Sequence, residues 1–114
     1  MIKVDIQEIV DINELLNDST STVIVKNRLQ GILASYHYYE TKEHQICSIF
    51  KGIIKNHAFI DANKRTGLLF LLLQIDRNNF NYLLSENEMY NLIQEIASTD
   101  ISVEEISQQL FNIK

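Results

Sequence analysis

The segment from Lys55 to Phe80 constrains the fold of this chain more than any other stretch of its sequence. It begins with a cluster of ionisable and amide side chains and continues directly into the run Gly67-Leu68-Leu69-Phe70-Leu71-Leu72-Leu73. A helix that is apolar on every side has to be buried. The order of these two parts predicts a buried central helix whose first turn carries the polar cluster to the surface.

Length and composition favour a single helical domain. The chain has 114 residues, no proline and three glycines, and 46% of its residues are hydrophobic. A chain of this length supports one core but not two. So few turn-forming residues favour helices with short connections over a turn-rich β-sandwich. We therefore expect one domain over residues 1–114.

Apolar residues recur at helical spacing along most of the chain. The expected helices cover residues 6–16, 23–36, about 42–56 and 64–77, and two more follow. Ser85 with Glu88 and Ser102 with Glu105 have the spacing of capping boxes, and these pairs mark the starts of the last two helices. The sequence predicts a compact all-α bundle of about six helices.

Other features of the sequence predict a cytoplasmic protein. The longest apolar run is far shorter than the roughly 18 to 20 residues that span a bilayer, so no membrane association is expected. The acidic N-terminal segment lacks the continuous apolar region of a signal peptide. Cys47 is the single cysteine, so it cannot form an internal disulfide and is expected to be a small core residue.

Charge is distributed unevenly along the chain. The net charge is −5, but residues 21–81 hold eight basic and four acidic residues, a local balance of +4. This positive part coincides with the polar cluster, as a site for a small phosphorylated ligand requires. A nucleic-acid-binding face usually shows a wider basic stripe, so direct binding of nucleic acid is not expected.

The polar cluster contains the side chains needed for phosphate chemistry. His57 can act as a general base or acid near neutral pH, and the Asp61 carboxylate can hold Mg²⁺ or orient His57. Asn63 can donate to an oxygen or orient the loop, and Lys64 and Arg65 can neutralise phosphate charge at a helix N-terminus. Phe59 is better explained as an apolar residue that anchors the loop.

Each of these residues also has an ordinary structural explanation. His57 would bond a carbonyl at a helix end, Asp61 would cap a helix, and Lys64 and Arg65 would be solvated surface charges. The presence of all five polar residues within nine positions, directly before an apolar helix, favours the functional interpretation. Zinc is disfavoured, because the three histidines lack close ligand spacing and the chain has one cysteine.

Aromatic and hydroxyl groups crowd the segment Tyr36-His37-Tyr38-Tyr39. One interpretation is a helix end whose tyrosines cover the edge of the core. The other is a flap beside the site that holds a protein substrate.

The motif His57-Ala58-Phe59-Ile60-Asp61-Ala62-Asn63-Lys64-Arg65-Thr66-Gly67 resembles the active-site motif of the Fic/Doc family, whose common Fic form reads HPFxxGNGRxxR. The Asp-Ala-Asn-Lys-Arg form is similar to the Doc (death-on-curing) branch, the toxins of Phd–Doc toxin–antitoxin systems. The likeness extends from about Val23 to the C-terminus and is weak over the first twenty residues. There, Doc-like proteins carry a longer glycine-containing segment.

Two departures from the Fic form bear on the reaction. Fic enzymes transfer AMP to a hydroxyl of a target protein, with glycine at the eighth motif position and a second arginine at the twelfth. Here these positions are Lys64 and Leu68. The lysine would crowd the phosphate site, and leucine cannot bind a phosphate. The resemblance to Doc then implies that ATP binds in reverse and that its γ-phosphate is transferred.

Carried over by position, the resemblance gives each motif residue a role. His57 deprotonates the acceptor hydroxyl, Asp61 holds Mg²⁺ or orients His57, and Phe59 is the buried anchor. The phosphates of ATP are bound by Asn63, Lys64 and Arg65. The implied target is a threonine of elongation factor Tu, whose phosphorylation stops translation.

Regulation by a separate partner is also implied. Many Fic proteins restrain themselves with a helix bearing Ser/Thr-x-x-x-Glu-Gly/Asn, and this motif is not found in the sequence. A Phd-like antitoxin with a disordered segment that folds on binding is therefore expected. Two alternatives remain: a Fic-type AMP transferase, and a catalytically silent module that only binds an antitoxin.

Overall fold

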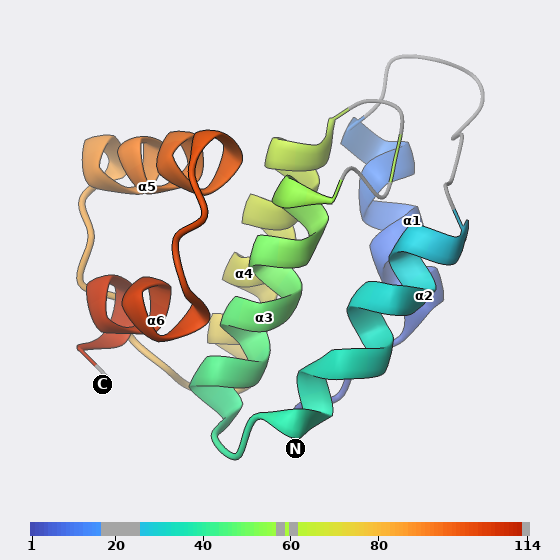
Figure 1. Cartoon of the computed structure of the whole chain (residues 1–114), viewed down its shortest axis with the longest axis horizontal. Coiled ribbons are helices and arrows are strands. Elements are labelled where there is room, and N and C mark those ends of the chain that lie inside the picture. The colour runs from blue at the N-terminus through green and yellow to red at the C-terminus, as the bar shows by residue number, and fades with distance from the viewer. Residues whose placement is uncertain (17–25, 57–58, 60–61, 113–114) are drawn as a thin grey trace.

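A computed structural model describes residues 1–16, 26–56, 59 and 62–112 of the chain. Within this part the secondary structure is helical, and the predicted all-α bundle is confirmed (Figure 1). The elements are α1 (Ile6–Leu16), α2 (Lys26–Ser35), the short 3₁₀ helix η1 (Tyr36–Tyr38), α3 (Lys42–Lys55), α4 (Asn63–Arg77), α5 (Glu86–Ser98) and α6 (Val103–Phe111). Val23–Val25, the predicted start of the second helix, lie outside the described residues.

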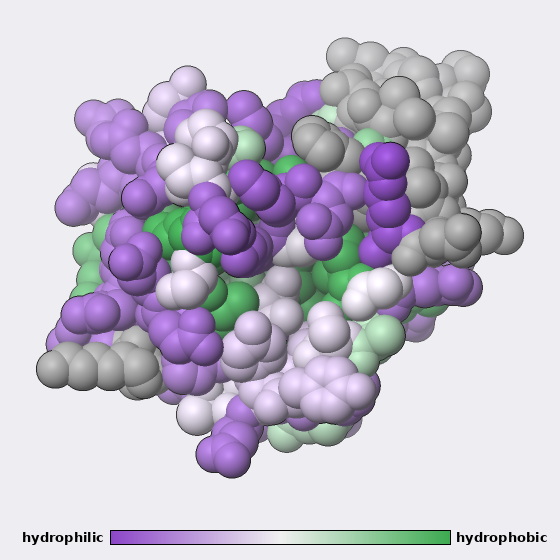
Figure 2. Space-filling model, in the orientation of Figure 1, coloured by the Kyte–Doolittle hydropathy of each residue, from purple (hydrophilic) through white to green (hydrophobic). Residues whose placement is uncertain are grey.

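The helices are arranged around α3, which contacts α2, α4, α5 and α6. Figure 1 shows α1 and α2 on one side of the α3–α4 pair and α5 and α6 on the other. Eight residues of α3 are buried, including Ile46, Phe50 and Ile53. Hydrophilic side chains cover most of the face seen in Figure 2, and apolar ones are visible as smaller patches among them.

Side-chain caps fix the starts of three helices where the sequence predicts them. The Thr41 hydroxyl accepts a hydrogen bond from the His44 N–H at 3.1 Å, which begins α3. Ser85 and Glu88 form a complete capping box at the start of α5. The Ser102 hydroxyl accepts from the Glu105 N–H at 3.1 Å at the start of α6. These bonds satisfy donors that have no partner inside the helix.

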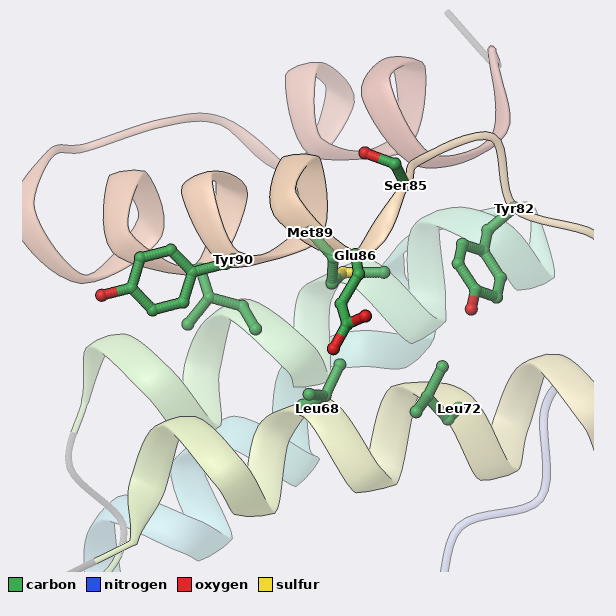
Figure 3. Close-up of a pocket in the computed structure, with 8 residues that line it drawn as sticks. Leu68, Leu72, Tyr82, Ser85, Glu86, Met89 and Tyr90 are labelled. Atoms are coloured by element: carbon green, nitrogen blue, oxygen red, sulfur yellow. The ribbon is translucent and has the colours of Figure 1, made fainter.

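Helix α4 is buried on one side only, so its apolar run is less enclosed than the sequence predicts. Thr66, Gly67, Phe70, Leu71, Gln74 and Ile75 are buried. Leu68 and Leu72 on the other side are half-buried, and Leu73 is 37% exposed. The most enclosed helix is α3, because it has neighbours on more sides. Leu68 and Leu72 line a cavity between α4 and α5 (Figure 3).

Gly67 allows α4 to lie close to α3. A Cβ atom at this position would be 2.8 Å from Cγ1 of Ile54, well inside ordinary van der Waals contact. The glycine therefore sets the close approach of the two helices directly after the polar motif. It also holds the first turn of α4 at a fixed place relative to the end of α3.

The N-terminal segment is joined to the bundle by polar contacts. The Ile2 N–H donates to Oε1 of Gln45 at 2.9 Å, and Nε2 of the buried Gln74 donates to the Lys3 carbonyl at 3.0 Å. Arg77 forms an ion pair with Glu8 at 3.0 Å. Together these contacts hold α1 against α4, the helix that begins with the motif.

Cys47 is fully buried in α3, as predicted for a small core residue. Burial raises the pKa of its thiol to about 12, so the thiolate is not available for chemistry near neutral pH. Across the described ranges, none of the helices combines the length and the apolar character needed to cross a membrane.

Candidate functional site

The candidate site is the connection between α3 and α4. Helix α3 ends at Lys55 and α4 begins at Asn63, so the motif occupies the turn between two helices packed along each other. The structure describes Asn56, Phe59 and Ala62 within this turn. The predicted catalytic residues His57 and Asp61 lie outside the described residues, so their roles remain predictions.

Phe59 anchors the turn in the hydrophobic core. Its side chain is 1% exposed and belongs to the same buried cluster as the core residues of α3 and α4. This placement agrees with the anchor role predicted from the sequence. The backbone at position 59 cannot move away without taking this ring out of the core.

Asn63 forms two hydrogen bonds with the backbone of Phe59. Its Oδ1 accepts from the Phe59 N–H at 3.0 Å, and its Nδ2 donates to the Phe59 carbonyl at 2.8 Å. The first residue of α4 thus holds the turn in place. Of the two roles that the sequence suggests for Asn63, the geometry shows the orientation of the loop, and binding of a phosphate remains a prediction.

Replacing Asn63 with alanine should lower the free energy of unfolding by about 1 to 3 kcal/mol, because two backbone groups of Phe59 lose their partners. Thermal unfolding followed by circular dichroism measures this loss. Asn63→Asp serves as the control, since the carboxylate still accepts from the Phe59 N–H but cannot donate to its carbonyl. A loss for Asn63→Asp as large as that for Asn63→Ala would contradict the argument.

Ala62 adopts a left-handed backbone conformation at the N-cap of α4. Its φ and ψ are 63° and 26°, a region that costs about 1 to 2 kcal/mol for a residue with a Cβ. The Fic form of the motif has glycine at this position, a residue that reaches this region without strain. The backbone therefore takes a shape that suits glycine although the residue is alanine.

Ala62→Gly is expected to leave the free energy of unfolding unchanged or to raise it by up to about 1 kcal/mol, because relief of strain outweighs the added freedom of the unfolded chain. Ala34→Gly, at an exposed position within α2, is the matched control and should lower it by about 1 kcal/mol. Urea denaturation measures both. Equal losses in the two variants would contradict the strain at Ala62.

The first turn of α4 is positively charged. Lys64 and Arg65 are exposed there, and no acidic residue accompanies them. By contrast, the first turns of α1, α3, α5 and α6 all contain glutamate. Helix N-termini favour negative charge and disfavour positive charge. An anion bound at this turn would interact with both cations and with the positive end of the helix dipole.

Lys64 also reaches across to α5. Its Nζ donates to Oε1 of Gln94 at 3.1 Å. This contact joins the first turn of α4 to α5 through a residue thirty positions further along the chain. The sequence gives no signal for the involvement of Gln94, because a glutamine on the polar side of an amphipathic helix is unremarkable.

A buried side chain of α1 contacts the first turn of α4. Nδ2 of Asn13 donates to Oγ1 of Thr66 at 3.0 Å, and both residues are fully buried. Neither residue was among the predicted site residues. Asn13 lies beside the buried Ile9 and Ile12 of α1, so an asparagine within the apolar stripe is the signal that could have identified it.

A small polar pocket adjoins the other end of the turn. It lies between α2 and α3, has a volume of about 190 Å³ and includes Asn56, the residue before His57. Lys51 and Lys55 line it. Lys55 donates to the Thr99 carbonyl at 2.7 Å and Lys51 pairs with Asp100 at 3.6 Å. These lysines therefore tie α3 to the connection between α5 and α6.

The predicted flap over the motif is not supported by its position. Tyr36, His37 and Tyr38 form η1, which precedes the start of α3, whereas the motif follows the end of α3 (Figure 1). The two places are separated by the fourteen residues of that helix, about 21 Å along its axis. Tyr36 and Tyr39 pack against the core, as the alternative interpretation predicts.

Comparison with known protein families identifies the motif-bearing segment. Residues 20–75 match the model of the Fic/DOC family. This range includes α2, α3, the motif and most of α4, and a comparison with curated proteins finds no match. The match agrees, over this part of the chain, with the resemblance drawn from the motif.

The predicted Mg²⁺ ligand Asp61 lies outside the described residues, so magnesium binding remains a prediction. Among the described residues there is no group of three or more histidine, cysteine, aspartate and glutamate side chains that could hold a metal. Mg²⁺ is often held by one or two carboxylates together with substrate phosphates, so a single carboxylate is compatible with that prediction.

Proposed function

We propose that this chain is a Doc-like transferase that moves the γ-phosphate of ATP to a Ser or Thr hydroxyl of a translation factor, with elongation factor Tu as the expected target. In this role it is the toxin of a toxin–antitoxin system and arrests translation. The match of residues 20–75 to the Fic/DOC family supports a Fic-type transferase in general, and phosphate rather than AMP transfer is the specific part of the proposal.

The observation that carries the proposal is the first turn of α4. It combines exposed Lys64 and Arg65 with an anchor at Phe59, whose backbone is held by Asn63. Phosphoryl transfer depends mainly on positioning and charge neutralisation. The anchored Phe59 and Asn63 support the first, and two cations at a helix N-terminus support the second.

Each motif residue then has a step to perform. His57 accepts the proton of the target hydroxyl as its oxygen attacks the γ-phosphorus, the bond from that phosphorus to the β,γ-bridging oxygen breaks, and ADP leaves. Lys64 and Arg65 stabilise the negative charge on the phosphates. Mg²⁺, held by Asp61, would neutralise further charge on the nucleotide. Phe59 and Asn63 keep the turn in the geometry that these contacts need.

The identity of two residues favours phosphate over AMP transfer. Lys64 occupies the position of a glycine in the Fic motif, and Leu68 occupies that of an arginine. Leu68 lines a mainly apolar cavity that holds the Glu86 carboxylate and no basic side chain among its described lining residues, a setting that does not suit a phosphate. The resemblance to Doc, in which ATP is bound in reverse, is consistent with both replacements.

A Phd-like antitoxin is the expected regulator, and it would fold onto this protein from a disordered segment. A catalytically silent module that only binds the antitoxin is the alternative from another class. The transferase and the silent binding module are distinguished by replacing motif residues and measuring whether ATP-dependent transfer and antitoxin binding are lost together or separately.

The deciding experiment is intact-mass spectrometry of purified elongation factor Tu after incubation with this protein, ATP and Mg²⁺. We expect the target to gain one phosphate. Gain of one adenylate would overturn phosphate transfer in favour of the Fic reaction. An unchanged mass would exclude elongation factor Tu as the target, and a search of lysate proteins for ATP-dependent modification would then decide whether the chain is a transferase.

A further inference from the structure

Helix α1 lies outside residues 20–75, the part of the chain that matches the Fic/DOC family, yet it packs along the helix that begins with the motif. The contacts between α1 and α4 occur in reverse order along the chain. Glu8, near the start of α1, pairs with Arg77 at the end of α4. Asn13, near the end of α1, bonds with Thr66 in the first turn of α4. The two helices therefore run antiparallel, and the C-terminal half of α1 lies beside the first turn of α4.

Of these two contacts, the one beside the motif is buried. Asn13 and Thr66 are both 0% exposed, and Nδ2 of Asn13 donates to Oγ1 of Thr66 at 3.0 Å. The side chains of the Glu8–Arg77 ion pair are 32% and 41% exposed, so water and salt weaken their attraction. A buried amide or hydroxyl group costs free energy unless it has a hydrogen-bond partner. The bond between Asn13 and Thr66 is therefore retained as long as α1 stays packed on α4.

Packing alone does not explain a polar pair at this place. Ile9 and Ile12 of α1 are buried beside Asn13 and already supply apolar contact with the core. Replacing both partners of a buried hydrogen bond with apolar groups of the same shape is often nearly neutral for stability. A hydrogen bond adds direction, because its donor and acceptor have to meet at a narrow range of distances and angles. The pair thus fixes the position of Thr66 more closely than apolar packing does.

Fixing Thr66 also fixes the two cations that precede it in the sequence. Thr66 directly follows Lys64 and Arg65. Its N–H donates to the Ala62 carbonyl at 2.9 Å, which closes the first turn of α4. Successive residues are about 100° apart around the axis of an α-helix. With Thr66 bonded to α1, the rotation of this turn about the helix axis is set, and Lys64 and Arg65 are left on the exposed side.

We infer that Asn13 is a positioning residue of the candidate site: it holds the first turn of α4 through Thr66 and so directs the two cations of that turn toward a bound polyphosphate. The identity of this ligand rests on the proposed function, whereas the hold of Asn13 on the turn does not depend on it. The inference extends the site beyond residues 20–75, because α1 supplies one of its parts.

Amide hydrogen exchange measured by NMR tests this hold without any ligand. The double variant Asn13→Leu/Thr66→Val removes the hydrogen bond and keeps side chains of similar shape at both positions, so we expect it to fold. The protection factors of the Gly67 and Leu68 amides, which bond into the first turn of α4, should fall about tenfold. The protection factor of the Leu92 amide in α5 should stay at its wild-type value. A fall of equal size in both helices, or no fall in either, would overturn the inference.

Binding of inorganic triphosphate tests the consequence for the two cations. In isothermal titration calorimetry the double variant should bind triphosphate about tenfold more weakly than the wild type, as expected when one charged hydrogen bond is lost. Glu8→Gln is the matched control, because it weakens a contact between the same two helices at the far end of α4, and it should bind as the wild type does. Thr66→Ser keeps the hydroxyl group and should recover most of the affinity.

The exchange and binding measurements separate this inference from the proposed function. If the double variant binds triphosphate as tightly as the wild type, the positioning role of Asn13 is refuted and the proposed function stands. If the wild type binds neither triphosphate nor ATP, the proposed function is refuted, and the protection factors still decide whether Asn13 holds the first turn of α4. An equal loss of affinity in the double variant and in Glu8→Gln would also overturn the inference, because any loosening of α1 would then have the same effect.

Discussion

Replacing His57 with alanine is expected to reduce ATP-dependent transfer to the target protein by a factor of about 10² to 10⁴, the usual contribution of a general base. In the sequence, the residue directly follows Asn56, the C-cap of α3, and comes two positions before the buried Phe59. Alanine removes the proton acceptor and leaves the anchor intact. Initial rates of phosphate incorporation into elongation factor Tu measure the loss.

His37→Ala is the matched control for this prediction. His37 is exposed on η1, at the opposite end of α3 from the motif, so its removal should leave the rate at the wild-type value. An equal loss in both variants would contradict the assignment of His57 as the base and would restore a role for the tyrosine-rich segment. Antitoxin binding retained by His57→Ala would separate catalysis from partner recognition.

Much of the fold could be predicted because its signals are local in the sequence. The apolar spacing of residues 6–16 and the Ser85–Glu88 pair fix helices through contacts within a few residues. Local signals also identify the motif, since its polar residues are close together in the chain. The match of residues 20–75 to the Fic/DOC family is consistent with this concentration of information.

The remaining features depend on how distant parts of the chain pack. The apolar run of α4 predicts complete burial. The structure instead has a cavity between α4 and α5, lined by Leu68 and Leu72, that no local sequence pattern predicts. The segment at Tyr36 and the motif flank α3 in the sequence, and the length of that helix separates them in space. The two ends of a helix are separated in space by the full length of that helix.

The polar contacts of the candidate site show the same limit. Asn13 and Thr66 are separated by 53 positions, and Lys64 and Gln94 by 30. Such pairs are formed only when the helices are in place, so residue type alone does not reveal them. Asn63 illustrates the intermediate case, because its partner Phe59 is four residues away and orientation of the loop was one of two roles that its chemistry suggested.

Replacing Phe59 with alanine is expected to lower the free energy of unfolding by about 3 to 5 kcal/mol, the usual cost of removing a buried aromatic side chain. The Phe59 ring lies in the core at 1% exposure, and its backbone is held by Asn63. This loss is a large fraction of the roughly 5 to 15 kcal/mol that is the usual free energy of unfolding of a domain. Urea denaturation followed by circular dichroism measures it.

Phe80→Ala is the matched control, since Phe80 is half-buried and its ring packs edge-on against Phe111 at a centroid distance of 5.9 Å. The same atoms are removed at a site that can relax into solvent, so the loss should be clearly smaller. Phe59→Leu should recover much of the stability by refilling the cavity. If Phe59→Ala and Phe80→Ala cost the same, the turn is not held by its buried ring, and the rigid placement of the motif would then rest on Asn63 and on the packing of α3 against α4 at Gly67.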